Sequence, residues 1–315
     1  MFGGKNKNSR RPIGVAVTPS GVRLAQVSPT VDGYALSAAA FAPLPPVTKP
    51  GTTHDSKTLG HAITTALKQA DFTGKQSVSA MPAQSMRYKN IRLPKMPESE
   101  LAQAVEWEAK ERIALGEPAS VQFYNAGEVR QGQDKRCEVV LLAAKQSAIQ
   151  AHVQALTQAG LEPIAIDATG GALARLSAPT GDVTFTVNLE PRHVEVVIAS
   201  QGRVLLNKLL PVGEGDLASA DLPELAREIG LCLRYHTVTF RGEKPEQILL
   251  AGEPAPQALL DAMSAALGLP SATFDQAGIL TPAPSLRAQP PLNPWAIAAG
   301  LSLRGHAVQT QRGAA

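Results

Sequence analysis

The feature that most constrains the fold is a pattern of three consecutive strands that occurs twice in the chain. Residues 13–44 hold two apolar runs joined by a Thr-Pro-Ser-Gly turn (residues 18–21) and followed by a third strand-like stretch. Residues 183–211 hold three further runs, with turn signals at residues 190–192 and 201–202. Each meander continues into helical and strand-like segments, so the sequence predicts two related α/β domains that face each other across a cleft.

The segment between the two meanders predicts the rest of the first sheet and then a unit of a different kind. Helical spacing over residues 54–70 and a short strand at 76–81 complete a mixed sheet with the first meander. The pattern then begins anew with an alternating strand, a helix that opens at Pro97 and two strand-like segments, before a helix that Gly160 closes. These segments therefore form a unit that differs from the mixed sheet before it.

The second meander is followed by the same kinds of element. We predict a helix over residues 223–240, a buried strand over 247–252, an amphipathic helix over 256–267 and a last helix over 293–305. The predicted limits are a basic flexible tail over residues 1–12, a first domain over 13–176, a second domain over 177–305 and a flexible tail over 306–315.

The composition excludes several classes of protein. No stretch approaches the roughly 18 apolar residues of a membrane-spanning helix, and no signal-peptide core follows the basic N-terminus, so we expect a cytoplasmic location. The basic tail predicts either disorder, which we favour, or weak contact with anionic lipid. The rest of the chain is nearly neutral and only 4% of the residues are aromatic, which argues against nucleic acid as a partner. Cys137, Cys232 and the histidines lack the spacing of a metal site, and Cys232 is expected to be a buried thiol.

Several stretches resemble PilM, the type IV pilus assembly member of the actin-like ATPase superfamily. The resemblance covers nearly the whole chain and is most specific in the middle. The matching stretches are "LPKMPESELAQAVEWEAKERIAL", "VQFYNAGEV", "LAAKQSAIQAHVQALTQAGLEPIAIDATGGALARL", "ILLAG" and the terminal "WAIAAGLSLRG". This resemblance implies an α/β fold of duplicated actin-like (ribonuclease H-like) domains, with the inserted α+β subdomain in the first half.

The resemblance also implies a function. PilM-like proteins lie in the cytoplasm, peripheral to the inner membrane, and capture the cytoplasmic N-terminal tail of a PilN-like bitopic membrane protein. The inserted subdomain would cover residues 86–160 and line the groove that receives this tail, with Met86, Tyr88 and Trp107 as the candidate partner-binding residues. Pilus motor or platform proteins are further candidate partners. The related cytoplasmic part of GspL from type II secretion is an alternative, although a membrane helix normally follows it.

The chain departs from the family at the turns that bind nucleotide. The family's first hairpin, G-I-D-I-G-S-S-S-I-K, has an acid where this chain has Ala16 and a glycine where it has Thr18. Pro19 also lacks a backbone N–H that could approach a phosphate. In the second turn Asn188 replaces an acid, and Glu190 puts a carboxylate where a phosphate would come close.

These departures predict a protein that is not an enzyme and has no catalytic residues, metal or cofactor. The vestigial nucleotide positions are Thr18, Ser20, Gly21, Asn188, Glu190 and Gly252, the last followed by Glu253 where a second glycine is expected. The segment that holds the nucleoside in members is shortened to residues 212–221. The alternatives are an ATP-binding switch or kinase of the same superfamily, with ATP and Mg bound, and an actin-like filament protein.

Two further motifs have both a functional and a structural interpretation. The Gly-Gly pair at residues 170–171 resembles a phosphate loop, but we expect Asp167 or Thr169 to act as the N-cap of the helix that begins there. Trp107 lies off the apolar stripe of its helix, so it is either part of a second packing face or an exposed anchor for the partner.

Three acids on the helix that carries Trp107 could suggest paired catalytic carboxylates. These acids, Glu106, Glu108 and Glu111, alternate with Lys110 and Arg112. The i,i+4 spacing between opposite charges favours a solvated helix face with ion pairs instead.

Overall fold

The first meander forms the antiparallel half of a six-stranded sheet. In the computed structural model, which describes residues 11–46, 54–113, 118–180, 183–212, 221–241, 244–284, 286 and 291–306, the sheet has the order β14-β3-β2-β1-β4-β8. Its strands are β1 (Ile13–Thr18), β2 (Gly21–Pro29), β3 (Tyr34–Pro43), β4 (Gln76–Met81), β8 (Glu162–Ala168) and β14 (Leu280–Pro282). β1 to β3 pair antiparallel, and β4, β8 and β14 join in parallel, so the predicted mixed sheet is confirmed.

The second meander starts a sheet with the same topology. Its strands are β9 (Thr184–Glu190), β10 (His193–Ser200), β11 (Arg203–Pro211), β12 (Ile248–Gly252) and β13 (Ser271–Thr273). The order β11-β10-β9-β12-β13 repeats the order β3-β2-β1-β4-β8 of the first sheet, with the same parallel and antiparallel pairings. The duplication predicted from the two meanders is therefore confirmed.

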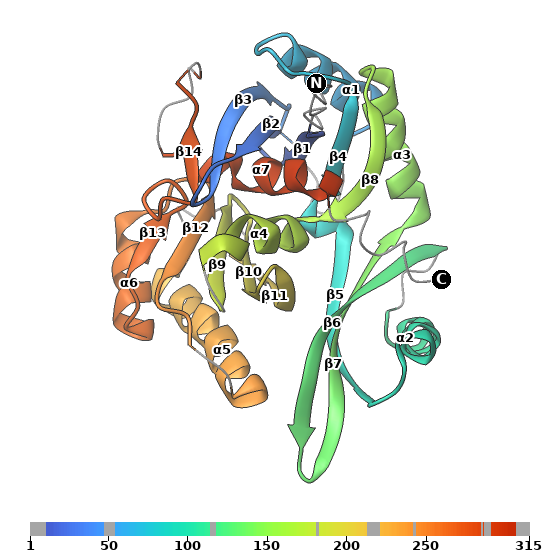
Figure 1. The fold of residues 1–315 in the computed structure, drawn as a ribbon, viewed down its shortest axis with the longest axis vertical. Coiled ribbons are helices and arrows are strands. Elements are labelled where there is room, and N and C mark those ends of the chain that lie inside the picture. Colours follow the sequence, from blue (N-terminus) through green and yellow to red (C-terminus); the bar gives the residue numbers. More distant parts are fainter. Residues whose placement is uncertain are drawn as a thin grey trace, which may run out of the picture.

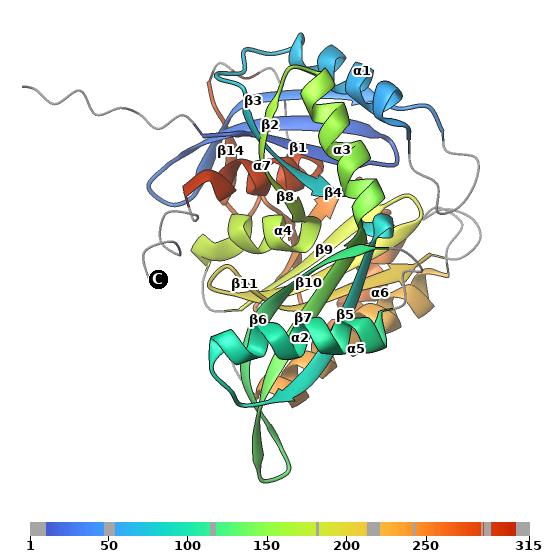
Figure 2. The ribbon, with the colours of Figure 1, turned by 90° about the vertical axis from the view of Figure 1, so that its right-hand side faces the viewer.

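The helices and sheets stack in five layers (Figures 1 and 2). α1 (Ser56–Leu67) and α3 (Gln146–Gln158) cover the outer face of the first sheet, and α5 (Leu222–Phe240) and α6 (Gln257–Leu267) cover the outer face of the second. Between the sheets lie α4 (Thr169–Ser177) and α7 (Ala296–Ser302). Single-turn 3₁₀ segments occupy Ala83–Ser85, Ala178–Thr180, Asn293–Trp295 and Leu303–His306.

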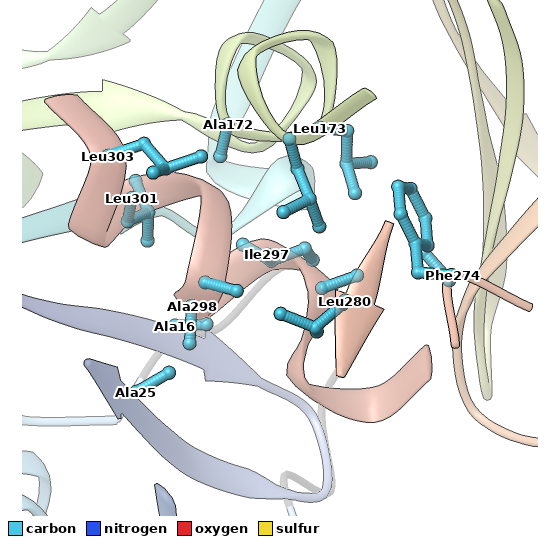
Figure 3. Close-up of a cluster of buried hydrophobic side chains, with 14 of the residues drawn as sticks. Ala16, Ala25, Ala172, Leu173, Phe274, Leu280, Ile297, Ala298, Leu301 and Leu303 are labelled. Atoms are coloured by element: carbon cyan, nitrogen blue, oxygen red, sulfur yellow. The ribbon is translucent and has the colours of Figure 1, made fainter. Parts of the chain in front are cut away.

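The middle layer is held by small residues and by an apolar core that both sheets share. Leu173 of α4 and Ile297 of α7 pack with Phe274 and Leu280 in this core (Figure 3). α7 approaches α4 so closely that a Cβ atom on Gly300 would lie 2.0 Å from the carbonyl oxygen of Ala172. Only glycine fits at this crossing, which joins the two domains.

The inserted subdomain is a three-stranded antiparallel sheet with one helix on one face. It consists of β5 (Met86–Pro94), α2 (Glu98–Arg112), β6 (Ala119–Gln131) and β7 (Asp134–Lys145), in the sheet order β5-β7-β6. α2 packs Leu101, Val105 and Ala109 against one face. On the other face the buried Glu138 accepts hydrogen bonds from Arg92 at 2.8 Å and from Tyr235 of α5, which ties the subdomain to the second domain.

The structure shifts two of the predicted domain limits. α3 packs through Ala155 and Leu156 on α1 and the first sheet, so the inserted unit ends at Lys145 and not at residue 160. β14 pairs with β3 in parallel, and α7 packs against β1 and α4. β14 and α7, which lie within the predicted second domain (177–305), therefore belong to the first domain. Their apolar residues complete the core between the sheets.

Some predicted features lie outside the described residues. They include residues 1–10 of the basic tail, residues 307–315 and most of the shortened segment, residues 213–220. None of the helices in the described part of the chain is long and apolar enough to cross a membrane.

Candidate functional site

The turn of the first meander lies at the cleft between the two domains. The buried Thr18 hydroxyl lies 3.0 Å from the carbonyl oxygen of Gly21, to which it donates, and accepts from Arg23 at 2.8 Å. Ser20 lies 3.1 Å from the same Arg23 guanidinium, whose carbon atom stands 4.8 Å from the centre of the Phe41 ring. The hydroxyl groups that could face a phosphate are thus engaged by the first domain's own arginine.

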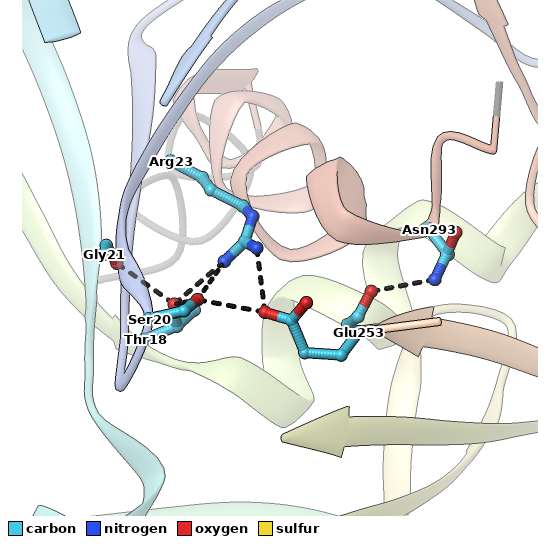
Figure 4. Close-up of polar contacts among 7 residues, drawn as sticks. Thr18, Ser20, Gly21, Arg23, Glu253 and Asn293 are labelled. Atoms are coloured by element: carbon cyan, nitrogen blue, oxygen red, sulfur yellow. Dashed lines mark hydrogen bonds and ion pairs between the residues drawn. The ribbon is translucent and has the colours of Figure 1, made fainter. Parts of the chain in front are cut away.

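Glu253 reaches across the cleft from the end of β12 to this turn (Figure 4). Its Oε1 atom accepts a hydrogen bond from Ser20 at 2.9 Å and forms an ion pair with Arg23 at 2.9 Å. Because Ser20 and Arg23 belong to the first domain and Glu253 to the second, these contacts join the two domains directly.

The second turn is buried and tightly packed. Asn188 is 1% exposed, and its Nδ2 atom lies 3.5 Å from Glu195. Gly252 has a φ of +80°, and a Cβ atom there would lie 2.1 Å from the carbonyl oxygen of Leu189, so the predicted glycine turn after β12 is present and requires glycine. Asn293 donates to the Gly252 carbonyl at 2.8 Å.

Glu190 is 3% exposed, and burial raises the pKa of its carboxyl group to about 8. At neutral pH this group is therefore protonated, which corrects the charged carboxylate that the sequence suggested. Its Oε2 atom has no hydrogen-bond partner among the described residues. Burial also raises the pKa of the neighbouring Glu195, whose carboxyl oxygens both lie 2.6 Å from the Thr169 hydroxyl.

The residues at the two turns do not fit the phosphates of a nucleotide. Thr18, Pro19, Asn188 and Glu190 help to line a cavity of about 10 Å³, which has room for a single water molecule. The Thr18 and Ser20 hydroxyls are already engaged by Arg23 and Glu253, and Pro19 offers no N–H. Glu253 holds the arginine that could otherwise pair with an anion.

The predicted N-cap at the Gly-Gly motif is wrong. α4 begins at Thr169 with Ala168 as its N-cap residue, and no side chain caps it. Asp167 instead forms ion pairs with Arg175 at 2.5 Å and with Arg304 at 2.9 Å. The other carboxylate oxygen, Oδ1, accepts from the backbone N–H of Ala168 at 2.8 Å.

The acidic helix of the inserted subdomain forms the expected ion pairs. Lys110 lies 3.2 Å from Glu106, and Arg112 pairs with Glu108. In the part of the chain that the structure describes, no three His, Cys, Asp or Glu side chains come together as metal ligands. Cys232 is buried as expected, as is Cys137.

The structure separates the three candidate partner-binding residues. Trp107 is 63% exposed on the face of α2 that points away from the sheet, so it is not part of a packing face. Met86 is 6% exposed and packs in a cluster with Met81 and Leu142, and Tyr88 packs against the same cluster. Met86 is thus largely covered by its neighbours, and Tyr88 is half-buried beside it.

Sequence reasoning missed the role of Arg23. This residue is a lone charge within "GVRLAQV" and stands at the place of the final lysine in the family's hairpin pattern. A single charged residue inside an apolar strand is expected to have a partner when it is buried, and that partner is 230 positions away. The lone charge was the available signal, but no local pattern identifies Glu253 as the partner.

A comparison with protein families identifies the family. The family described as Type IV pilus assembly protein PilM matches residues 14–181, which is more than half of the 315-residue chain. This chain belongs to the PilM family. Its fold is the actin-like fold that the resemblance implied, with the duplicated sheets described above.

Several solved structures are similar to this chain. A PilM-PilN type IV pilus biogenesis complex is 23% identical in sequence with a TM-score of 0.74, covering 94% of this chain and 98% of that chain. The ethanolamine utilization protein EutJ from Carboxydothermus hydrogenoformans is 11% identical with a TM-score of 0.50, covering 93% and 89%. The cytoplasmic domain of EpsL, from the type II secretion system of Vibrio cholerae, is 10% identical with a TM-score of 0.45, covering 91% and 92%. No curated protein sequence matches the chain.

Proposed function

We propose that this protein is a non-catalytic scaffold of type IV pilus assembly that binds the cytoplasmic N-terminal tail of a PilN-like membrane protein. The observation that carries the proposal is the likeness to the PilM-PilN complex over 94% of the chain, together with membership in the PilM family. In this proposal the protein is cytoplasmic and reaches the inner membrane through its partner.

The inserted subdomain supports the tail-binding part of the proposal. Its helix α2 is anchored by Leu101, Val105 and Ala109, which are at most 2% exposed, so the opposite face is presented on a rigid support. Trp107 stands on that face beside the Lys110–Glu106 ion pair. An exposed tryptophan on a rigid helix is the type of residue that dominates binding free energy at protein interfaces.

The two turns support the non-catalytic part. Ala16 is 1% exposed and offers no carboxylate to orient a metal ion, and the Thr18 and Ser20 hydroxyls are engaged by Arg23 and Glu253. Catalysis of phosphoryl transfer depends on positioned metal ions and donors around the phosphates. We therefore propose that the protein binds neither ATP nor Mg²⁺ in the cleft.

Replacing Trp107 with alanine is expected to weaken tail binding about 30-fold, the ratio that corresponds to an interface tryptophan worth about 2 kcal/mol. The measurement is a calorimetric titration of the purified protein with a synthetic peptide of the PilN homologue's cytoplasmic N-terminal segment. Val238→Ala is the matched control, because Val238 is a 68% exposed apolar residue on α5, in the second domain. Equal affinities for Trp107→Ala and the wild type would mean that Trp107 does not contribute to tail binding.

A further inference from the structure

The contacts between Arg23, Ser20 and Glu253 differ from an ordinary surface ion pair. The Arg23 side chain is 9% exposed and that of Glu253 is 29% exposed, so solvent screens the pair less than a pair on the outer surface. Oε1 of Glu253 accepts from both Ser20 and Arg23, at 2.9 Å each. A single carboxylate oxygen thus holds two groups of the opposite domain.

Both ends of this ion pair are fixed to their own domain. On the first domain, Arg23 donates to Thr18 at 2.8 Å and stacks over the Phe41 ring. On the second domain, the backbone N–H of Glu253 donates to the carbonyl oxygen of Leu189 in β9 at 2.8 Å. Because neither end can move far without its domain, the ion pair fixes the distance between the domains.

The ion pair joins the two domains at the positions that bind nucleotide in the family pattern. Ser20 lies in the first turn and Glu253 follows Gly252 at the end of β12, two places, one in each domain, that the family pattern assigns to nucleotide binding. A ligand that contacts both turns stabilises the arrangement in which they are close. Glu253 makes the same connection with a side chain of the protein itself.

We propose that Arg23 and Glu253 are positioning residues that form a permanent latch and hold the two domains closed without a nucleotide. α4 packs against β10 and β11 of the second sheet, and α7 packs against β1 and β2 of the first, so their crossing, where Gly300 abuts the Ala172 backbone, connects the two domains and acts as the hinge. This inference extends beyond the proposed function, because it concerns the isolated protein and holds whether or not the tail binds.

The test measures the distance between the domains in the purified full chain. Spin labels on cysteines at Thr65 of α1 and Asp261 of α6, two exposed positions on the outer faces of the two domains, report this distance by electron paramagnetic resonance. The native Cys137 and Cys232 are each 6% exposed and are not expected to react. We expect one narrow distance distribution for the otherwise unchanged chain, and a broader one shifted to longer distances for Glu253→Gln and for Arg23→Gln.

The exchanged pair Arg23→Glu with Glu253→Arg is expected to restore the narrow distribution. Glu224→Gln is the matched control, because it removes an ion pair with Arg227 that lies within α5 and is expected to leave the distance unchanged. Thermal unfolding of each variant confirms that it is folded. Narrow, unshifted distributions for both single Gln variants would overturn the latch. A broad distribution that the exchanged pair fails to restore would overturn it as well.

Discussion

Replacing Gly300 with alanine is expected to destabilise the protein by about 3 kcal/mol or more. The added Cβ would lie 2.0 Å from the Ala172 carbonyl oxygen and 2.6 Å from its carbonyl carbon. These are backbone atoms of α4, so no side chain can rotate away and the helices themselves must separate. Separation opens the core that Leu173 and Ile297 share between the two sheets. The measurement is the free energy of unfolding in urea, with circular dichroism as the probe.

Gly230→Ala is the matched control for this prediction. Gly230 also lies inside a helix, α5, and a Cβ atom there would make only an ordinary contact of 3.7 Å with Leu267. Alanine is favoured over glycine in a helix by about 1 kcal/mol, so this variant is expected to be as stable as the wild type or more stable. If both variants lost the same stability, the cost at Gly300 would not come from the helix crossing.

Replacing Glu190 with glutamine is expected to remove a large part of the pH dependence of stability. Burial raises the pKa of this carboxyl from 4.5 to about 8, so the folded protein holds a proton that the unfolded chain releases in this range. The stability linked to Glu190 is fully present below pH 4.5 and is lost as the pH rises to about 8, a change on the order of 5 kcal/mol. Because glutamine is uncharged at every pH, the free energy of unfolding of the variant does not fall through this titration.

The experiment compares urea unfolding of the wild type and Glu190→Gln at several pH values from 5 to 9. The stability difference between the two proteins is expected to shift in favour of the variant up to about pH 8 and then to level off. His152 and His193, whose pKa values burial lowers to about 4, affect the acid side of both profiles equally. Parallel profiles would mean that Arg23, which faces Glu190 together with Glu195 and Glu253, keeps the carboxyl ionised.

Local patterns were sufficient to predict most of the strands and helices. β4 has the predicted limits, and the turns at residues 190–192 and 201–202 connect β9, β10 and β11 as expected. The repeated order of elements also predicted the duplicated sheets. These features depend on the alternation of apolar residues and on turn-forming residues, which neighbouring positions specify.

Features that depend on contacts between distant residues could not be predicted. α3 was assigned to the inserted unit because it follows β7 in sequence, whereas Leu156 is buried in the core of the first domain. Asp167 has the residue type of an N-cap, but its carboxylate pairs with Arg175 and with Arg304, which is 137 positions away, and it does not cap α4. The state of Glu190 likewise depends on burial by both domains, and a sequence pattern contains no measure of that burial.

The candidate site was predicted in part. The sequence identified the altered turns at Thr18 and Glu190, and the structure brings both to one cavity of about 10 Å³. It did not identify the ion pair between Arg23 and Glu253, which joins the two domains across the cleft. The sequence was therefore sufficient to predict that the turns lack the family's phosphate-binding donors and acids. It was not sufficient to predict the new contacts that the cleft contains instead.

The most direct test of the account is one titration made with and without nucleotide. The purified protein is titrated with the synthetic N-terminal segment of its PilN homologue, first in buffer and then with millimolar Mg-ATP. A scaffold that needs no nucleotide predicts saturable binding with the same affinity in both conditions and no heat of ATP binding. Absence of tail binding, or an affinity that requires Mg-ATP, would contradict the account.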